Sequence, residues 1–333
     1  MRAIFLCKRE KEVQRVYANG VIARLQKLVT LAENIYTKED VLVSPSDFAD
    51  VEIILSTWGM PQFSEEEIAA CFPRLKCVFY AAGTVQSFAR PFLARGVKVF
   101  SAWAANAVPV AEYTVAQILL ATKGFFAQTR LLQGQRHEDA KVRKGATRGN
   151  YGTRVGLIGC GMIGSMVAEK LKDYRLEVVV FDPFLSEERA KALGVTRVSP
   201  EELFSTSLVV SNHLANNAQT KGMLNGELLE KLIPYATFLN TGRGAQVVEE
   251  DLVQVLEARP DLTAVLDVTY PEPPEADHPF YTLENCFLTP HIAGSLGDEV
   301  VRMAEYMETE LAAYLAGEPT KYEVSEKMLE TMA

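Results

Sequence analysis

Three side chains that could together reduce a carbonyl beside a carboxylate follow short apolar runs of the sequence. Arg243, Glu272 and His291 each come a few residues after a run that is typical of a buried β-strand. The carboxyl ends of strands in an open parallel sheet face its ligand crevice, so we expect the three side chains to share one edge. A guanidinium binds a carboxylate through its fork of donors, and a protonated imidazole donates to a carbonyl oxygen that gains negative charge. The trio predicts interconversion of a 2-keto acid and a 2-hydroxy acid.

Each residue has a separate role in this hypothesis. Arg243 binds the substrate carboxylate, and His291 is the general acid or base. Glu272 would keep the imidazole charged and oriented, because a nearby opposite charge favours the protonated form. Taken singly, the three have ordinary readings as a surface charge, a solvated loop residue and a hydrogen-bonded core histidine. Their common position after strands favours the site.

A glycine-rich turn supplies the hydride donor that this chemistry needs. Gly159, Gly161 and Gly164 lie between a predicted strand and a predicted helix, where they allow a tight turn and close approach of a pyrophosphate. Asp182 ends the next strand about 20 residues on, where an acid binds the adenosine ribose hydroxyls. Asp182 would repel a 2′-phosphate, and no Arg stands directly beside it. The pattern therefore predicts NAD rather than NADP.

The elements that must position these residues form two α/β units. Helical segments separate predicted strands over residues 3–6, 51–56, 77–80, 97–100, 155–158, 178–181, 208–211, 237–239, 264–268 and 287–289. We expect helices from about Pro109 to Lys123 and over the apolar positions between residues 300 and 315. The fold class is α/β, with two doubly wound parallel-sheet domains. A Rossmann NAD-binding domain (103–294) would be inserted into a flavodoxin-like substrate domain (1–102 and 295–333).

Composition narrows the class of protein. The chain has 333 residues, with 34 Lys and Arg against 43 Asp and Glu, a formal charge of -9. No basic run is present, so nucleic acid is not an expected partner. The first apolar run is too short for a signal peptide or a membrane span, and the five cysteines show no paired spacing. We expect a cytoplasmic protein with reduced thiols, no membrane partner and no bound metal.

Of the other histidines, we expect His137 to be exposed, His213 to lie near the cofactor edge and His278 to be structural.

The ordered motifs resemble the D-2-hydroxyacid dehydrogenase family, which includes phosphoglycerate, glyoxylate/hydroxypyruvate, D-lactate and formate dehydrogenases. The resemblance covers most of the chain. Besides the glycine turn with Asp182, it rests on Asn106-Ala-Val-Pro-Val-Ala-Glu-Tyr113, Asn240-Thr-Gly-Arg-Gly244, Leu266-Asp-Val-Thr-Tyr-Pro-Glu-Pro273 and Leu288-Thr-Pro-His-Ile-Ala-Gly294.

The resemblance implies further site residues and an oligomeric state. It implies an Arg/Glu/His triad at Arg243, Glu272 and His291, with Asp267 near the nicotinamide carboxamide. Residues implied to line NAD are Thr84, Met162, Ile163, Leu214, Thr241 and Gly294, and those implied to face the substrate carboxylate are Ala82 and Gly83. Family members are usually homodimers built around the helix near Pro109.

Two segments depart from the family pattern and leave alternatives open. The loop His213-Leu-Ala-Asn-Asn-Ala-Gln-Thr220 lacks the prolines common in relatives. The stretch Ser56-Thr-Trp-Gly-Met-Pro61 has no Arg or Lys for a substrate phosphate, so Trp58 and Met60 favour a small or apolar side group over a phosphorylated one. A phosphorylated substrate such as 3-phosphoglycerate stays an alternative. So does a non-enzymatic NAD sensor like the C-terminal-binding-protein corepressors, which would have no need of the triad.

Overall fold

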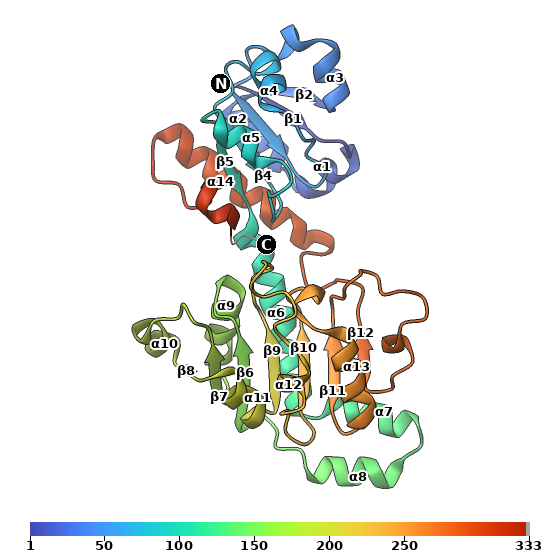
Figure 1. The fold of residues 1–333 in the computed structure, drawn as a ribbon. Helices are drawn as coiled ribbons and strands as arrows, with labels where there is room; N and C mark the ends of the chain where they lie inside the picture. Colours follow the sequence, from blue (N-terminus) through green and yellow to red (C-terminus); the bar gives the residue numbers. More distant parts are fainter. Residues whose placement is uncertain (331–333) are drawn as a thin grey trace. The chain divides into compact units, whose positions relative to one another are not determined.

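The structure, a computed structural model, describes residues 1–330 and divides into two compact units (Figure 1). Unit 1 comprises residues 1–107 and the segment from Ser295 onward, and unit 2 comprises Val108–Gly294. The first division therefore falls at 107/108, a few residues beyond the 102/103 expected from the sequence. The second falls at 294/295.

Unit 1 is built on a six-stranded sheet. Its strands are β1 (Arg2–Leu6), β2 (Thr30–Tyr36), β3 (Ile53–Ser56), β4 (Cys77–Tyr80), β5 (Lys98–Ser101) and β13 (Glu323–Val324). The order is β13-β5-β4-β3-β1-β2, and only β13 runs antiparallel to its neighbour. The five parallel strands have the flavodoxin-like order that was expected. The sequence did not predict β2, because this edge strand has no fully buried residue and carries Ala, Glu and Asn instead of an apolar run.

Helices cover the unit 1 sheet and complete its core. They are α1 (Glu10–Val16), α2 (Val21–Leu28), α3 (Lys38–Val43), α4 (Glu65–Cys71), α5 (Ala89–Ala94) and α14 (Val301–Ala316). The last of these lies beside β4 and β5 (Figure 1) and buries Met303, Met307 and Leu311 in the core of unit 1. The apolar spacing of the C-terminal segment thus correctly predicted a helix that packs on the first domain.

Unit 2 is built on a seven-stranded, all-parallel sheet. Its strands are β6 (Tyr151–Ile158), β7 (Arg175–Phe181), β8 (Thr196–Arg197), β9 (Val209–Asn212), β10 (Thr237–Asn240), β11 (Thr263–Leu266) and β12 (Cys286–Leu288). The order is β12-β11-β10-β9-β6-β7-β8, the doubly wound arrangement of a dinucleotide-binding domain with one added strand. Only β8, two residues long and exposed, was absent from the sequence prediction.

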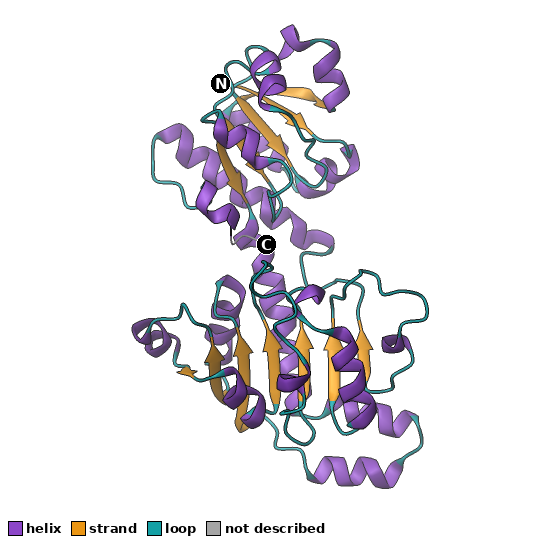
Figure 2. Cartoon of the chain, viewed as in Figure 1, coloured by secondary structure: helices purple, strands orange, loops and turns teal. Residues whose placement is uncertain are grey.

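Two layers of helices bury the faces of this sheet (Figure 2). One apolar cluster joins the strands to α6 (Trp103–Thr122), α9 (Met162–Leu171) and α10 (Glu187–Leu193). The other joins them to α11 (Pro200–Thr206), α12 (Gly226–Leu229) and α13 (Glu249–Ala258). Helices α7 (Phe125–Gln133) and α8 (His137–Gly145) follow α6. Because both faces are covered, the strands are nearly continuous apolar runs, which is why the sequence revealed them.

Helix α6 begins earlier than the sequence predicted. Pro109 was expected near the helix start but lies inside the helix, which starts at Trp103. The preceding residues are rich in alanine, a strong helix former, and extend the helix on the N-terminal side of the proline.

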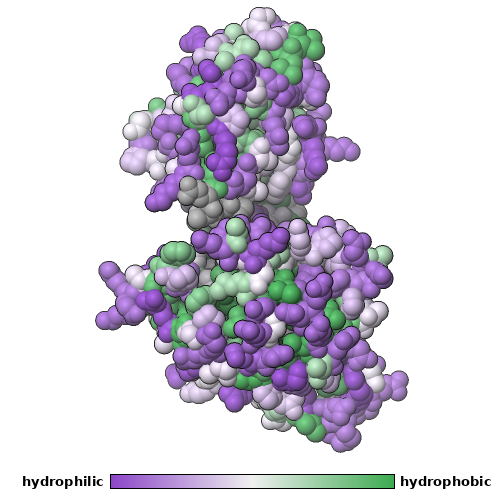
Figure 3. Space-filling view, viewed as in Figure 1, coloured by the Kyte–Doolittle hydropathy of each residue, from purple (hydrophilic) through white to green (hydrophobic). Residues whose placement is uncertain are grey.

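The surface of each unit is mostly hydrophilic on the face shown in Figure 3, with hydrophobic residues in small patches. Over residues 1–330, no helix has the length and apolar character needed to cross a membrane. All five cysteines are free thiols, and four of them are buried as small core residues.

Candidate active site

The structure brings His291 and Glu272 into direct contact. The His291 Nδ1 atom lies 2.6 Å from Glu272 Oε1, and the two side chains are 45% and 41% exposed on unit 2. With Nδ1 facing the carboxylate, Nε2 is the nitrogen left for a substrate. Both residues follow strand ends, Glu272 after β11 and His291 after β12, at the edge where the arrowheads of the unit 2 sheet point in Figure 1.

The loop that carries His291 is fastened to Asp267. Its buried carboxylate accepts hydrogen bonds from Ile292 N at 2.8 Å, Ala293 N at 2.9 Å and the Thr289 hydroxyl at 2.6 Å. His291 itself adopts φ of +55°, a conformation that is rare for residues other than glycine. These bonds hold the backbone in this shape and aim the imidazole. A role of Asp267 in orienting His291 was not anticipated from the sequence.

Arg243 is held by a buried network of amide side chains. Gln246 Oε1 accepts from Arg243 N at 3.1 Å and from Asn212 Nδ2 at 2.6 Å. Asn240 joins the network by accepting from Asn212 Nδ2 and donating to Arg243 O. Gln246 Nε2 donates to the carbonyls of Leu214 and Ala215, at 2.8 and 3.0 Å. The amide side chain of Gln246 thus connects the loop 213–220, which lacks prolines, to the Arg243 loop.

The guanidinium of Arg243 lies at the same edge as Glu272. Burial lowers the pKa of Arg243, and the charge of Glu272 opposes that change. Among the hydrogen bonds of the described residues, the Arg243 guanidinium makes one, from Nη1 to Gly242 O at 2.8 Å. The other donors are therefore available for a carboxylate ligand.

A close backbone contact links the Arg243 loop to the Glu272 loop. A Cβ atom added to Gly244 would lie 2.0 Å from the carbonyl carbon of Thr269. Only glycine allows this approach, so the residue after Arg243 fixes its distance from the segment that leads to Glu272.

The glycine turn has the shape that a diphosphate requires. Gly159 adopts φ of +89°, and a Cβ on Gly164 would lie 2.2 Å from Gly159 O, so the turn and the helix pack tightly. A Cβ on Gly161 would meet nothing within 4 Å, which leaves open space before α9. Gly161 caps this helix without a side-chain hydrogen bond, so its first N–H groups can bind an anion.

Asp182 lies against this turn. Its Oδ2 accepts from Cys160 N at 2.6 Å, and its Oδ1 accepts from Phe184 N at 2.8 Å. His213 packs beneath the turn, with its Nε2 2.9 Å from Ser211 Oγ, and burial lowers its pKa to about 4. His213 is therefore a neutral structural residue, whereas Asp182 lies at the strand end beside the glycine turn.

Apart from Thr84, which belongs to unit 1, the remaining residues expected to line NAD lie at the same edge of unit 2. Met162 and Ile163 open α9, and Leu214 follows β9. Thr241 follows β10, and its hydroxyl lies 3.0 Å from that of Thr114 on α6. Gly294 ends the His291 loop and is the last residue of unit 2.

The residues expected to bind substrate in unit 1 follow two neighbouring strands. Ala82 and Gly83 come after β4 and are followed by Thr84, which was expected to line NAD. The carbonyl of Ala82 accepts from Ala102 N at 3.0 Å. Trp58 comes after β3, and the Arg15 guanidinium lies 5.4 Å from its ring centre. A cation therefore stands beside the loop 56–61, which the sequence of that loop alone did not reveal.

Several structural contributors to the site were missed by the sequence reading. The amides Asn212, Asn240 and Gln246 carried a weak signal, since two of them end strands and the third stands three residues after Arg243. Arg15 is distant in the sequence from the loop that it contacts. Among residues 1–330, no group of three or more His, Cys, Asp or Glu side chains is arranged to hold a metal ion.

Known proteins resemble both the sequence and the fold. The family model described as the NAD binding domain of D-isomer specific 2-hydroxyacid dehydrogenases matches residues 115–293. A D-3-phosphoglycerate dehydrogenase of Archaeoglobus fulgidus is 31% identical over 241 residues, 69% of this chain and 45% of that protein. A formate dehydrogenase of Chaetomium thermophilum is 30% identical over 285 residues, 81% of this chain and 76% of that protein. The chain thus spans about half the length of the phosphoglycerate dehydrogenases it matches.

Solved structures agree on the fold. The apo D-mandelate dehydrogenase of Rhodotorula graminis superposes with a TM-score of 0.79 at 20% identity, and the match covers 98% of this chain and 97% of that one.

Proposed function

Because the chain belongs to the D-isomer specific 2-hydroxyacid dehydrogenase family, we propose that it moves a hydride between NAD(H) and a small 2-keto or 2-hydroxy acid. The observation that carries the proposal is the 2.6 Å contact between His291 Nδ1 and Glu272 Oε1, at the edge that also bears Arg243. An NAD sensor has no need for an imidazole held by a carboxylate beside an unpaired guanidinium.

The protein side chains divide the work of this reaction. Arg243 binds the substrate carboxylate through its free donors and orients the neighbouring carbonyl. His291 Nε2 gives a proton to the carbonyl oxygen in reduction and takes it back in oxidation. Glu272 accepts from Nδ1, which fixes the orientation of the ring and leaves the mobile proton on Nε2. Trp58, Ala82 and Gly83, in the loops after β3 and β4, are proposed as further substrate-binding residues.

The cofactor would occupy the edge of unit 2 that carries the glycine turn. The open space at Gly161 and the free N–H groups of α9 suit a pyrophosphate, and Asp182 suits the adenosine ribose hydroxyls. Thr84, Met162, Ile163, Leu214, Thr241, Asp267 and Gly294 are proposed to line the rest of NAD. When bound, the nicotinamide supplies or accepts the hydride.

A substrate panel tests the proposal. NADH oxidation is followed with glyoxylate, hydroxypyruvate, pyruvate, 2-ketoisocaproate, phenylpyruvate and 3-phosphohydroxypyruvate. We expect turnover of at least one acid, and we expect His291→Asn to lower kcat by about 10²- to 10⁴-fold while the Kd for NADH stays within about twofold.

His137→Asn is the matched control, because this histidine is exposed on α8 and should leave kcat unchanged. Tight NADH binding without turnover of any acid would favour the sensor instead. Full activity of His291→Asn would refute the catalytic role.

A phosphorylated substrate is the second candidate, and Arg15 is the observation that favours it. Its guanidinium stands over Trp58, and Arg9 packs against the position of Gly59 in the same loop. Arg15 is also paired with Glu12 at 2.8 Å, which weakens its attraction for a phosphate. If 3-phosphohydroxypyruvate is the preferred substrate, Arg15→Gln should raise its KM about tenfold or more and leave the KM for pyruvate unchanged.

The assembly is proposed to be a homodimer. Hydrophobic side chains are exposed along α6, α7 and α8, with Leu120, Phe125, Leu132 and Val142 between 38% and 66% exposed. Sedimentation should give twice the chain mass, and Leu132→Glu with Val142→Glu should give monomers. Val43→Glu, an exposed position on α3, should leave the dimer intact.

The cytoplasm is the proposed location, because all five cysteines are unpaired. Fractionation of cells that express the tagged full-length protein tests this, and its recovery from an exported fraction would contradict it.

A further inference from the structure

A second carboxylate and imidazole lie behind the loop that carries Glu272. Glu249 is the first residue of α13, and its Oε1 accepts a hydrogen bond from Tyr270 N at 2.8 Å. Its Oε2 lies 3.8 Å from His278 Nε2. The two side chains are only 11% and 18% exposed, so both polar groups are largely withdrawn from water.

The tautomer of His278 suits this contact. His278 Nδ1 accepts from Phe280 N at 3.2 Å, so a neutral ring carries its proton on Nε2, toward Glu249. The ring also packs on Phe280, with centroids 4.4 Å apart. Glu249 therefore contacts the loop at two points, residues 270 and 278, and Glu272 lies between them.

We propose that Glu249 and His278 are positioning residues that hold the loop 270–278, so that Glu272 stays within hydrogen-bond reach of His291. The inference rests on the proposed function, since it assigns the pair a part in the same reaction. Neither residue touches the reacting atoms. Their effect passes through Glu272, whose own contact with His291 is the 2.6 Å hydrogen bond.

The charge of Glu249 makes this support sensitive to pH. Burial raises the pKa of Glu249 to about 7, against the opposing effect of the Tyr270 N–H. The other titratable groups that face it are His278 and the Cys286 thiol on β12. Lys221 lies over the Tyr270 ring, with its Nζ 5.7 Å from the ring centre. Cys286 stays protonated, because burial and Glu249 raise its pKa to about 12. An ionised carboxylate accepts from an amide more strongly than a neutral acid, so the loop is best held above pH 7.

The same charge works against stability, which separates a functional role from a structural one. A carboxyl group with a raised pKa in the fold binds its proton more tightly there than in the unfolded chain. The stability that it contributes is present below pH 4.5 and is lost as pH rises from there to about 7, the folded pKa of Glu249. An uncharged side chain that still accepts from Tyr270 N would make the protein equally or more stable at pH 8.5. A purely structural role therefore does not explain why this position carries an ionisable carboxyl group.

The test compares pH profiles of kcat for reduction of whichever 2-keto acid is turned over, at saturating NADH from pH 5.5 to 9. We expect a loss of kcat on the acid side near pH 7 in the natural protein and its absence in Glu249→Gln, whose Tm at pH 8.5 is unchanged or higher. Glu249→Ala should lower kcat about tenfold at all pH values with an unchanged Kd for NADH. Glu249→Asp, which keeps an ionisable carboxyl group, should show the acid-side loss of kcat that Glu249→Gln lacks.

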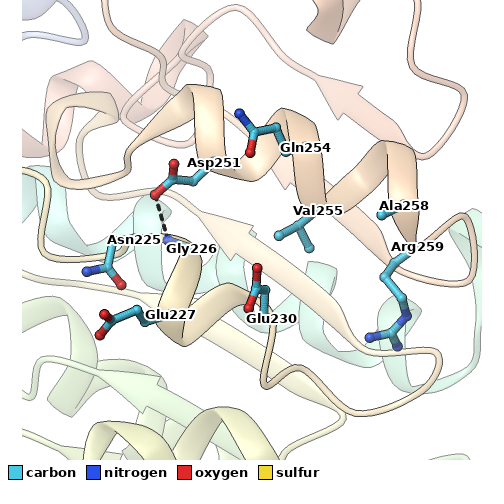
Figure 4. A pocket seen from close by; sticks show the side chains of 9 residues that line it. All are labelled: Asn225, Gly226, Glu227, Glu230, Asp251, Gln254, Val255, Ala258 and Arg259. Atoms are coloured by element: carbon cyan, nitrogen blue, oxygen red, sulfur yellow. Dashed lines mark hydrogen bonds between the residues drawn. The ribbon is translucent and has the colours of Figure 1, made fainter.

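Asp251→Asn is the matched control. Asp251 stands in the same first turn of α13 and accepts a backbone N–H, that of Gly226 at 2.7 Å, but it faces a pocket of about 670 Å³ beside α12 (Figure 4). Its pH profile should match that of the natural protein. An acid-side loss that persists in Glu249→Gln, or that Asp251→Asn also abolishes, would overturn the proposal.

A second measurement does not depend on activity. The amide of Tyr270 should show hydrogen-exchange protection at pH 8 that falls at least tenfold in Glu249→Ala and is kept in Asp251→Asn. Unchanged protection in Glu249→Ala would overturn the proposal. If the natural protein reduces no 2-keto acid, the proposed function fails, while this measurement still shows whether Glu249 holds the loop.

Discussion

Burial separates the histidines of unit 2 into different kinds of residue. His291 keeps 45% of its side chain exposed and faces a carboxylate, whereas His213 is sealed under the glycine turn and its pKa falls to about 4. A buried imidazole without a charged partner stays neutral, because the charged form loses its hydration. The same side chain is thus fit for proton transfer at one position and for packing at the other.

The low pKa of His213 predicts an acid-dependent loss of stability. The unfolded chain binds a proton near pH 6.5 and the folded one only near pH 4, so stability is fully present above 6.5 and declines as pH falls through this window. We expect the loss to approach about 3 kcal/mol at pH 4. Denaturant unfolding at pH 7.5 and 4.5 should show a smaller loss for His213→Gln, and the exposed His137→Gln should behave like the natural protein. An equal loss in His213→Gln would contradict this.

Gly244 is the residue whose size matters most for the site. Gly244→Ala would place a Cβ 2.0 Å from the backbone of Thr269 and push the Arg243 loop away from the Glu272 loop. We expect kcat/KM to fall by about 100-fold or more, since displacements near 1 Å have such effects. Gly145→Ala on α8, where an added Cβ meets nothing within 4 Å, should leave kinetics unchanged. A Gly244→Ala enzyme with normal kcat/KM would show that the contact is not needed.

At the scale of elements, the ends of β9 and β10 are joined by Gln246, which is fully buried. Its amide contacts the Arg243 backbone on one side and the carbonyls of Leu214 and Ala215 on the other. A loop proposed to line NAD and a loop proposed to bind the substrate carboxylate therefore share one support. Buried polar networks of this kind specify geometry when every member is satisfied.

Gln246→Leu should test this shared support. It removes the acceptor of the Arg243 N–H and one of the two acceptors of the Asn212 amide, so we expect a rise of about tenfold or more in the KM of the 2-keto acid. The Kd for NADH should also rise, because the Leu214 loop loses its donor. Fluorescence titration and steady-state kinetics measure the two effects. Gln254→Leu, an exposed glutamine on α13, is the control, and equal effects in both variants would argue against the network.

At the scale of the whole molecule, unit 1 is formed by two segments of the chain that lie before and after unit 2 in the sequence. Helix α14 contributes Met303, Met307 and Leu311 to the core of unit 1, and β13 adds a strand beside β5. Tyr314 lies near the stacked rings of Phe79 and Phe100. Unit 1 therefore depends on residues separated from its first strand by about the whole chain, whereas unit 2 is continuous.

This arrangement predicts that core substitutions in α14 act on one unit. Leu311→Ala should destabilise unit 1 by about 2–5 kcal/mol, the usual cost of such a cavity, while the Kd for NADH stays unchanged. Leu315→Ala, at a half-buried position of the same helix, should cost less. Denaturant unfolding followed with limited proteolysis of each unit, combined with NADH titration, measures both effects. Weakened NADH binding in Leu311→Ala would contradict the independence of the units.

The sequence by itself predicted the two sheets and the cofactor, and it named the three residues that we propose as the catalytic trio. Strands covered on both faces must be apolar throughout, and a turn that admits a pyrophosphate must be rich in glycine, so both leave local signals. Strands β2 and β8 were not predicted, because strands at a sheet edge need no continuous apolar run. The start of α6 was misplaced because Pro109 was taken as the helix boundary.

The tertiary structure alone decided how the trio is supported. Gln246, Asp267 and the pair Glu249 and His278 act through contacts between different strand ends, and single polar residues have no periodicity that marks them in a sequence. Arg15 on α1 lies near Trp58 because β1 and β3 are neighbours in the sheet of unit 1, although the two residues are distant in the sequence. Residue types that follow predicted strands indicate the chemistry. The burial and the partners that orient those side chains arise only when distant segments pack together.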